Sequence, residues 1–192
     1  MLALITGPVR SGKSDYAMRV ARELGQPITY VATARLDPTD AEMADRVARH
    51  RAERGPEIAA IELWAPGNPD LPAVVATAAA GTTLLVDSLG TWIAGHLLDL
   101  ETLAEVDAPA ALANLEAKTA ALLPRLAAAR ANIVIVSEET GWGLVPPSPL
   151  GRIFRDHVGR TSARIASVAD RVHLVVAGYA LDLKASGVPV RP

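Results

Sequence analysis

The segment GPVRSGKS, residues 7–14, combines residue types and spacing that point directly to chemistry. It fits G-x-x-x-x-G-K-[ST] at every defined position, after an apolar run and before a helical one. Glycines let such a loop curl so that successive N–H groups converge on an anion, and the helix start adds positive potential. The alternative interpretation is a Gly/Ser turn that precedes an amphipathic helix and binds nothing. We expect this glycine loop to contact nucleotide phosphates through Gly7, Pro8, Val9, Arg10, Ser11, Gly12, Lys13 and Ser14.

Three side chains would complete such a phosphate site. Lys13 would reach the β- and γ-phosphates as a catalytic group, and the Ser14 hydroxyl would bind Mg²⁺. Asp87 ends the apolar run TLLVD, and a carboxylate at the carboxyl edge of a parallel sheet could be the second magnesium ligand. Asp87 could equally cap the helix that follows, and the two roles are compatible.

His50 is a further candidate for catalysis. In an expected helix over residues 39–54, Met43, Val47 and His50 share a face that turns toward the protein body. Neighbouring cations favour a neutral imidazole, which is a competent nucleophile toward phosphorus, and a bound polyphosphate would relieve their repulsion. These cations are Arg46, Arg49, Arg51 and Arg54. A histidine on a half-buried helix face is also commonly a packing residue, so both interpretations stay open.

The elements that position these groups follow from hydrophobic patterning. Short runs rich in β-branched residues are apolar on both faces, as in parallel strands covered by helices on two sides. They span residues 2–6, 28–33, 82–88, 132–138 and 172–178. Helices are expected over 14–24, 39–54, 89–98, 109–131 and 149–169, with Pro124 splitting the fourth, and residues 65–72 read as a turn. The alternation predicts an α/β fold, a three-layer P-loop NTPase with a mostly parallel RecA-like sheet, as one domain over residues 1–192.

Composition excludes several classes of function. A net charge of −2 gives no electrostatic reason to expect nucleic acid or an anionic membrane as partner. The absence of cysteine excludes disulfides, thiolate metal sites and a cysteine nucleophile, and agrees with a cytoplasmic location. No apolar run approaches the roughly 20 residues that cross a bilayer. His96, His157 and His173 lack the spacing of a metal site or triad and are taken as structural.

The chain resembles the bifunctional adenosylcobinamide kinase / adenosylcobinamide-phosphate guanylyltransferase family of adenosylcobalamin biosynthesis. The resemblance covers nearly the whole chain, and its matching segments are ITGPVRSGKS, YVATARLD, DAEMADRVARHRAERG, IELW, LLVDSLGTWI and the stretch from VSEETGWG to GYALDLK. It implies that ATP or GTP phosphorylates adenosylcobinamide, and that GMP from GTP is then joined to adenosylcobinamide phosphate. In the family a histidine carries the GMP, and His50 stands at the matching position.

The resemblance also implies further contacts and partners. Residues at GTP-contacting positions of the family are Thr33, Ala34, Arg35, Arg51, Ala52, Glu53, Arg54, Glu62 and Asp87. A homotrimer is implied as well. Independently of the resemblance, Trp92 and Trp142 stand out in a chain with little aromatic content and are candidates for a ligand pocket or a subunit contact. The sequence departs from the commonest family pattern at Pro8-Val9 and at Glu138-Glu139. The alternatives are a P-loop kinase without guanylyl transfer and a GTP-binding switch, although the Asn-Lys-x-Asp guanine motif of switches is absent from the sequence.

Overall fold

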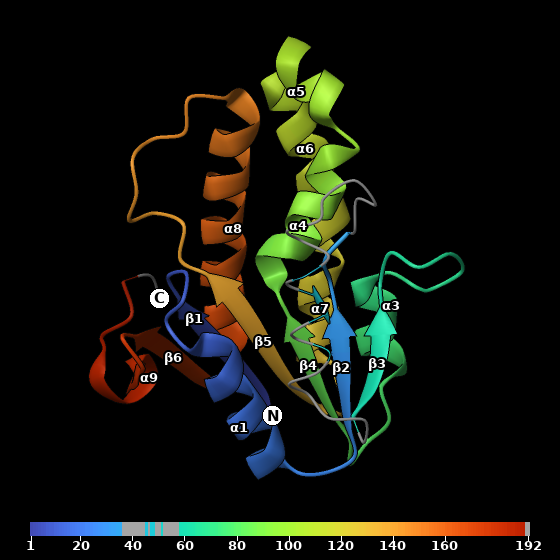
Figure 1. Ribbon diagram of the computed structural model, residues 1–192, viewed down its shortest axis with the longest axis vertical. Coiled ribbons are helices and arrows are strands. Elements are labelled where there is room, and N and C mark those ends of the chain that lie inside the picture. The colour runs from blue at the N-terminus through green and yellow to red at the C-terminus, as the bar shows by residue number, and fades with distance from the viewer. Residues whose placement is uncertain (36–44, 46, 49–50, 52–57, 191–192) are drawn as a thin grey trace.

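The computed structural model describes residues 1–35, 45, 47–48, 51 and 58–190 (Figure 1). Within this part of the chain, seven strands form one sheet in the order β3-β2-β4-β5-β1-β6-β7. Neighbouring strands are parallel except β6 and β7, which are antiparallel. The strands are β1 (Leu2–Gly7), β2 (Ile28–Ala32), β3 (Ala59–Glu62), β4 (Thr83–Asp87), β5 (Asn132–Glu138), β6 (Arg171–Val176) and β7 (Tyr179–Asp182). The mostly parallel α/β sheet predicted from the sequence is confirmed.

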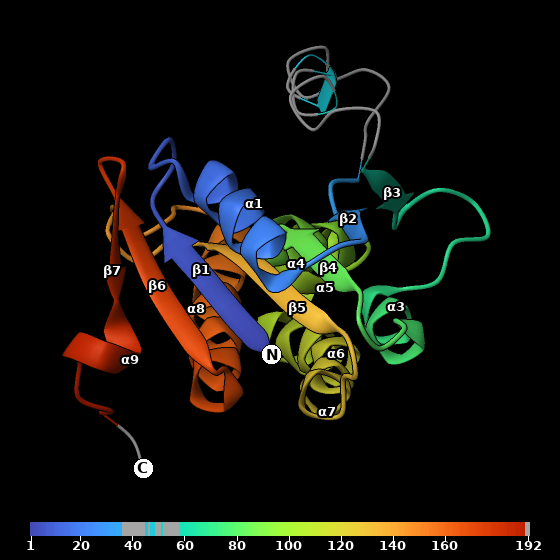
Figure 2. The same cartoon turned by 90° about the horizontal axis from the view of Figure 1, so that it is seen from below.

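Helices cover both faces of the sheet, as Figure 2 shows. Helix α1 (Lys13–Leu24) lies on one face. The opposite face is covered by α3 (Leu71–Thr77), α4 (Leu89–Leu98), α6 (Ala108–Ala120), α7 (Leu122–Ala127) and α8 (Pro149–Val168). Two further helices are short: α5 (Glu101–Val106) precedes α6, and α9 (Leu183–Ser186) follows β7. In the described ranges, no helix is long and apolar enough to cross a membrane.

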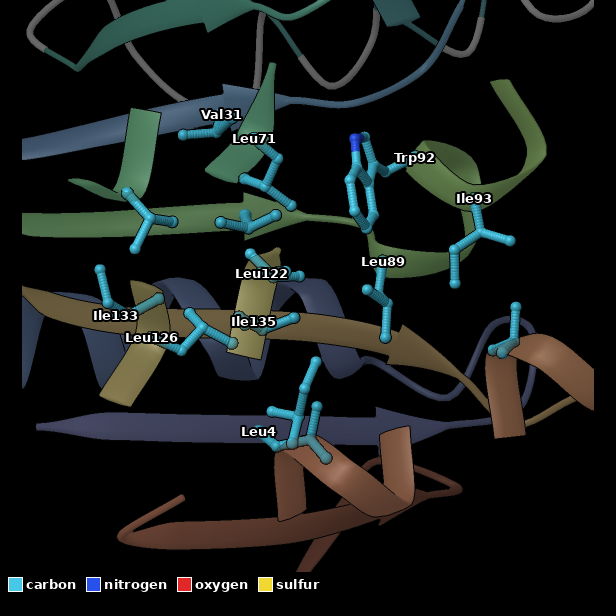
Figure 3. Packing of buried hydrophobic residues seen from close by; sticks show 14 of the residues in the cluster. Leu4, Val31, Leu71, Leu89, Trp92, Ile93, Leu122, Leu126, Ile133 and Ile135 are labelled. Atoms are coloured by element: carbon cyan, nitrogen blue, oxygen red, sulfur yellow. The ribbon is translucent and has the colours of Figure 1, made fainter. Parts of the chain in front are cut away.

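Two hydrophobic cores, one on each face of the sheet, explain why the central strands are apolar on both faces. Successive side chains of a strand point to opposite faces, so Leu4 joins the core under α4 and α8 while Ile5 joins the core under α1. Figure 3 shows the larger core, where residues from β1 and β5 meet side chains of α4 and α7. Its labelled members include Leu4, Leu89, Trp92, Leu122, Ile133 and Ile135. The carboxyl ends of the parallel central strands therefore lie together at one edge of a sheet that is packed on both faces.

Most predicted elements are found, with a few additions. The five predicted strands and the helices corresponding to α1, α4 and α8 are confirmed, and the alanine-rich helix is split as expected, with Pro124 in the first turn of α7. Strands β3 and β7 and helices α3, α5 and α9 were not predicted. The turn expected over 65–72 is too long, because Asp70 caps α3 by accepting a hydrogen bond from the Leu71 N–H at 2.7 Å. Of the helix predicted over 39–54, the structure describes only residues 45, 47, 48 and 51, which are helical.

Candidate nucleotide-binding site

The glycine loop joins the end of β1 to the start of α1, as the sequence predicts. Gly7 has no room for a side chain, because a Cβ there would lie 2.3 Å from the backbone oxygen of Val175 in β6. Gly12 has φ of +91°, a left-handed conformation that glycine adopts without steric cost, and it directly precedes α1. The Gly178 N–H donates to the Ser11 carbonyl at 3.0 Å, so the turn between β6 and β7 supports the loop.

The loop presents polar groups that suit an anion. Gly12 caps α1 without any side-chain hydrogen bond, which leaves first-turn N–H groups of the helix for a ligand. The Ser11 hydroxyl is buried and has no hydrogen-bond partner in the described part of the chain. Lys13 folds back over the loop, where its Nζ donates to the Pro8 carbonyl at 3.3 Å. A phosphate group could replace that carbonyl as the partner of the ammonium.

Asp87 ends β4, and its carboxylate is held from the neighbouring strand. The Tyr30 hydroxyl of β2 donates to Asp87 Oδ2 at 2.9 Å. The alternative role of Asp87 as a helix cap is wrong, because Ser88 caps α4 and accepts a hydrogen bond from the Thr91 N–H at 3.3 Å. The carboxylate of Asp87 is therefore oriented by Tyr30 and is not used by the helix.

Glu138 is a second carboxylate at this edge, and sequence reasoning did not assign it a role. It ends β5, the strand between β4 and β1. Its Oε2 accepts a hydrogen bond from the Gly90 N–H at 2.9 Å, and its Oε1 accepts one from the Ser88 hydroxyl. Burial raises the pKa of Glu138, an effect that nearby Lys13 opposes and nearby Asp87 reinforces. Lys13, Asp87 and Glu138 therefore share one electrostatic environment.

A pocket of about 380 Å³ lies at the carboxyl ends of β2 and β3. It is lined by Ala34, Arg35, Glu62, Trp64, Ala65 and Asp99, and we call it the Trp64 pocket. The Arg35 guanidinium carbon lies over the Trp64 ring, 5.4 Å from the ring centroid. The same guanidinium forms an ion pair with Asp99, with 2.5 Å between its nitrogen and the carboxylate oxygen. Glu62 pairs with Arg51. The structure thus gathers Ala34, Arg35 and Glu62, all expected from the family resemblance, around one cavity.

Other predicted site residues have different surroundings. Thr33 is fully buried, and its hydroxyl donates to the Ser88 carbonyl at 2.7 Å, so its expected GTP contact stays a prediction. The expectation for Trp92 is wrong, because it is a fully buried core residue whose Nε1 donates to Asp70 at 2.7 Å. Trp142 is 62% exposed. His50, Ala52, Glu53 and Arg54 lie outside the described residues.

Ser14 and Asp87 offer the ligand chemistry that Mg²⁺ prefers, a hydroxyl and a carboxylate oxygen. Among the described residues, no group of three or more His, Cys, Asp or Glu side chains is placed to hold a metal. Mg²⁺ commonly needs no such cage, because it binds one or two carboxylates together with substrate phosphates and waters. The Tyr30 hydrogen bond holds one carboxylate oxygen of Asp87. The residues present therefore fit a magnesium-nucleotide site.

Comparison with known proteins places the chain in a family. Residues 3–183 match the family described as cobinamide kinase / cobinamide phosphate guanyltransferase. The bifunctional adenosylcobalamin biosynthesis protein CobP of Pseudomonas aeruginosa is 38% identical over 188 residues, which cover 96% of this chain and 98% of that protein. The protein CobU of Escherichia coli, described in the same words, is 31% identical over 96% of this chain and all of its own length. Among solved structures, the RadB recombinase matches with a TM-score of 0.44 and 15% identity, covering 90% of this chain and 73% of that one. On the family match and the two relatives, this chain belongs to the cobinamide kinase / cobinamide phosphate guanyltransferase family.

Proposed function

We propose that the chain phosphorylates adenosylcobinamide with ATP or GTP and then transfers GMP from GTP to adenosylcobinamide phosphate, giving adenosylcobinamide-GDP. Membership of the family supports both reactions. One structural observation supports them most directly: the glycine loop, Asp87 and the Trp64 pocket all lie at the carboxyl ends of parallel strands in one sheet. Ligands of open α/β sheets bind at this edge.

In this proposal the glycine loop binds the triphosphate. N–H groups of the loop and of the first turn of α1, together with Lys13, stabilise the charge that develops on the transferred or departing phosphates. Ser14 and Asp87 would hold Mg²⁺, which when bound neutralises phosphate charge. The hydrogen bond from Tyr30 to the Asp87 carboxylate supports this role by restricting its orientation.

We assign the base of GTP to the Trp64 pocket. Trp64 offers an aromatic face, which Arg35 now covers at 5.4 Å, and purine rings stack on such faces. The Glu62 carboxylate can accept hydrogen bonds from the N1–H and 2-amino groups of guanine, which adenine lacks. The Trp64 Nε1 donates to the Thr33 carbonyl at 2.9 Å and thereby fixes the ring. This pocket would favour GTP over ATP in the guanylyl transfer.

His50 is proposed as the GMP carrier. The neutral imidazole attacks the α-phosphorus of GTP, a nitrogen–phosphorus bond forms, and the bond to the bridging oxygen breaks as pyrophosphate leaves. An oxygen of adenosylcobinamide phosphate then attacks the same phosphorus and displaces the imidazole. Arg51, which follows His50 in the sequence, pairs with Glu62 of the Trp64 pocket, and this supports a role for the segment in nucleotide binding.

Labelling with GTP tests the covalent step. After incubation with α-labelled GTP and Mg²⁺ and then denaturation, label should stay on the protein, survive alkali and be released by acid, whereas γ-labelled GTP should leave none. His50→Ala should abolish the label and retain kinase activity, and Lys13→Ala should abolish both. Lys184→Ala, at an exposed lysine, is the matched control and should change neither. Equal loss of both activities in a folded His50→Ala protein would contradict a dedicated carrier role.

We also propose that residues 1–192 form one domain, that the protein is a homotrimer and that it acts in the cytoplasm, where nucleoside triphosphates are available. Exposed apolar side chains on the edge strand β7 support a subunit contact, since Tyr179 is 83% and Leu181 51% exposed. Sedimentation equilibrium should give three times the chain mass of 20.1 kDa. A monomer at micromolar concentration would contradict the trimer.

A further inference from the structure

Glu138 and Gly90 form a matched pair next to the glycine loop. The Gly90 N–H donates to Glu138 Oε2 at 2.9 Å. A Cβ on residue 90 would lie 2.2 Å from that same oxygen and 2.8 Å from the Glu138 Cδ, distances that real Cβ contacts do not show. Glycine is unfavourable inside a helix, yet Gly90 lies in the first turn of α4. Its absence of a side chain admits the carboxylate to this position.

The carboxylate is well placed to hold the start of α4. It accepts a hydrogen bond from the Gly90 N–H, one of the helix N-terminal donors that have no partner within the helix. Its other oxygen accepts the hydroxyl of Ser88, the cap residue of the same helix. Both oxygens of Glu138 are therefore engaged with the segment that directly follows Asp87.

This contact also connects two parts of the site. The Ser88 carbonyl accepts a hydrogen bond from the buried Thr33 hydroxyl. The Thr33 carbonyl in turn accepts a hydrogen bond from the Nε1 of Trp64, which lines the Trp64 pocket. On the other side, the backbone N–H of residue 139, next to Glu138, donates to the Gly7 carbonyl at 2.9 Å, where the glycine loop begins. Figure 1 shows β5 between β4 and β1, the arrangement that lets one side chain bridge them.

We propose that Glu138 is a positioning residue for nucleotide binding. Its carboxylate fixes the Asp87–Ser88 segment relative to the glycine loop, so that Asp87 meets the magnesium ion of a nucleotide whose phosphates the loop holds. The role lies in the hydrogen bonds to Gly90 and Ser88 and in the space at Gly90, not in the negative charge of Glu138. The inference rests on the magnesium role proposed above for Asp87.

The test measures binding of a non-hydrolysable GTP analogue by calorimetry, with and without Mg²⁺. Glu138→Ala and Gly90→Ala should each reduce the enhancement of affinity by Mg²⁺ about 10- to 100-fold, as loss of a residue that orients a metal ligand does. Glu138→Gln should stay within about threefold of the original protein, because an amide oxygen can accept from Gly90 while the amide group donates to Ser88. Gly159→Ala is the matched control: this helical glycine is exposed, a Cβ there meets nothing within 4 Å, and binding should not change.

A second readout is independent of the metal. Hydrogen exchange at the Gly90 amide should accelerate in Glu138→Ala and remain slow in Glu138→Gln. In the Glu138→Ala background, Gly90→Ala should weaken binding no further, since its methyl group then meets no carboxylate. If Glu138→Ala fails to fold, Gly90→Ala and Glu138→Gln alone decide the outcome.

The possible failures are distinguishable. Full enhancement by Mg²⁺ in Glu138→Ala or Gly90→Ala would overturn the positioning role alone. A loss in Glu138→Gln as large as in Glu138→Ala would overturn it as well, because charge would then be the property that matters. Absence of any Mg²⁺ effect in the unaltered protein would overturn the proposed metal site and this inference together.

Discussion

Acidification should destabilise the protein through His157, a buried histidine of α8. The side chain is fully buried, and the Thr119 hydroxyl lies 2.9 Å from its Nε2. Burial lowers the pKa of His157 from 6.5 to about 4, an effect that Glu116 opposes and that Arg164 and Arg160 reinforce. The imidazole is therefore neutral in the folded protein at pH values where the unfolded chain would protonate it.

The sign and size of the effect follow from linkage. Between the folded pKa of about 4 and the unfolded value of 6.5, the unfolded chain binds more protons than the folded protein. The stabilisation is therefore fully present above pH 6.5 and is lost as the pH falls toward 4. With these two pKa values, lowering the pH from 7 to 5 removes about 2 kcal/mol of unfolding free energy through this one group.

Urea unfolding at pH 7 and pH 5, followed by circular dichroism at one protein concentration, measures this loss. The control variant is His157→Gln, which can still hydrogen-bond to Thr119 but does not titrate. Carboxylates that titrate in both proteins cancel in the comparison, so the original protein should lose about 2 kcal/mol more than the variant between the two pH values. Equal losses in the two proteins would refute the assignment of a depressed pKa to His157.

Three substitutions test other parts of the site and core. Gly7→Ala places a methyl group 2.3 Å from a backbone oxygen of β6, so it should displace the glycine loop and weaken GTP binding at least about 100-fold in calorimetry; unchanged binding would contradict the tight approach. Gly95→Ala places a methyl group 2.2 Å from the Trp64 ring and should shift tryptophan fluorescence and weaken GTP binding about 10-fold, whereas retained affinity would exclude Trp64 from the base site. Trp92→Phe removes the hydrogen bond to Asp70 and should cost about 1–3 kcal/mol in urea unfolding while GTP affinity stays the same; a loss of affinity would show that this core residue acts on the site.

The central sheet could be predicted because its strands are buried on both faces. Residues 2–5 and 133–136 are uninterrupted apolar runs, a pattern typical of strands that are covered on both faces. The edge strands β3 and β7 have four residues each, with partly or fully exposed side chains, and so lack this signal. The sequence predicts a turn at the start of α3 because Asp70 and Pro72 are common in turns, although both are also favoured where a helix begins.

The candidate site could be predicted where function lies in a local pattern. The glycine loop is one contiguous motif, so its place between a strand and a helix followed from the sequence. Glu138 and Gly90 lie 48 residues apart, and their contact depends on β5 being inserted between β4 and β1. Strand order is a tertiary property that the linear sequence does not display. Trp64 was missed for the same reason, because the residues around its pocket come from separate elements.

Two carboxylates at equivalent strand ends illustrate how environment assigns different roles. Asp87 and Glu138 end neighbouring parallel strands on the same edge of the sheet. Tyr30 holds one oxygen of Asp87, which orients the group without using both of its oxygens. Glu138 has both oxygens engaged, by Gly90 and Ser88. With each of its oxygens directed at a donor of the α4 start, the Glu138 carboxylate is turned toward that segment. These contacts support our proposals that Asp87 is the metal ligand and that Glu138 positions the segment that carries it.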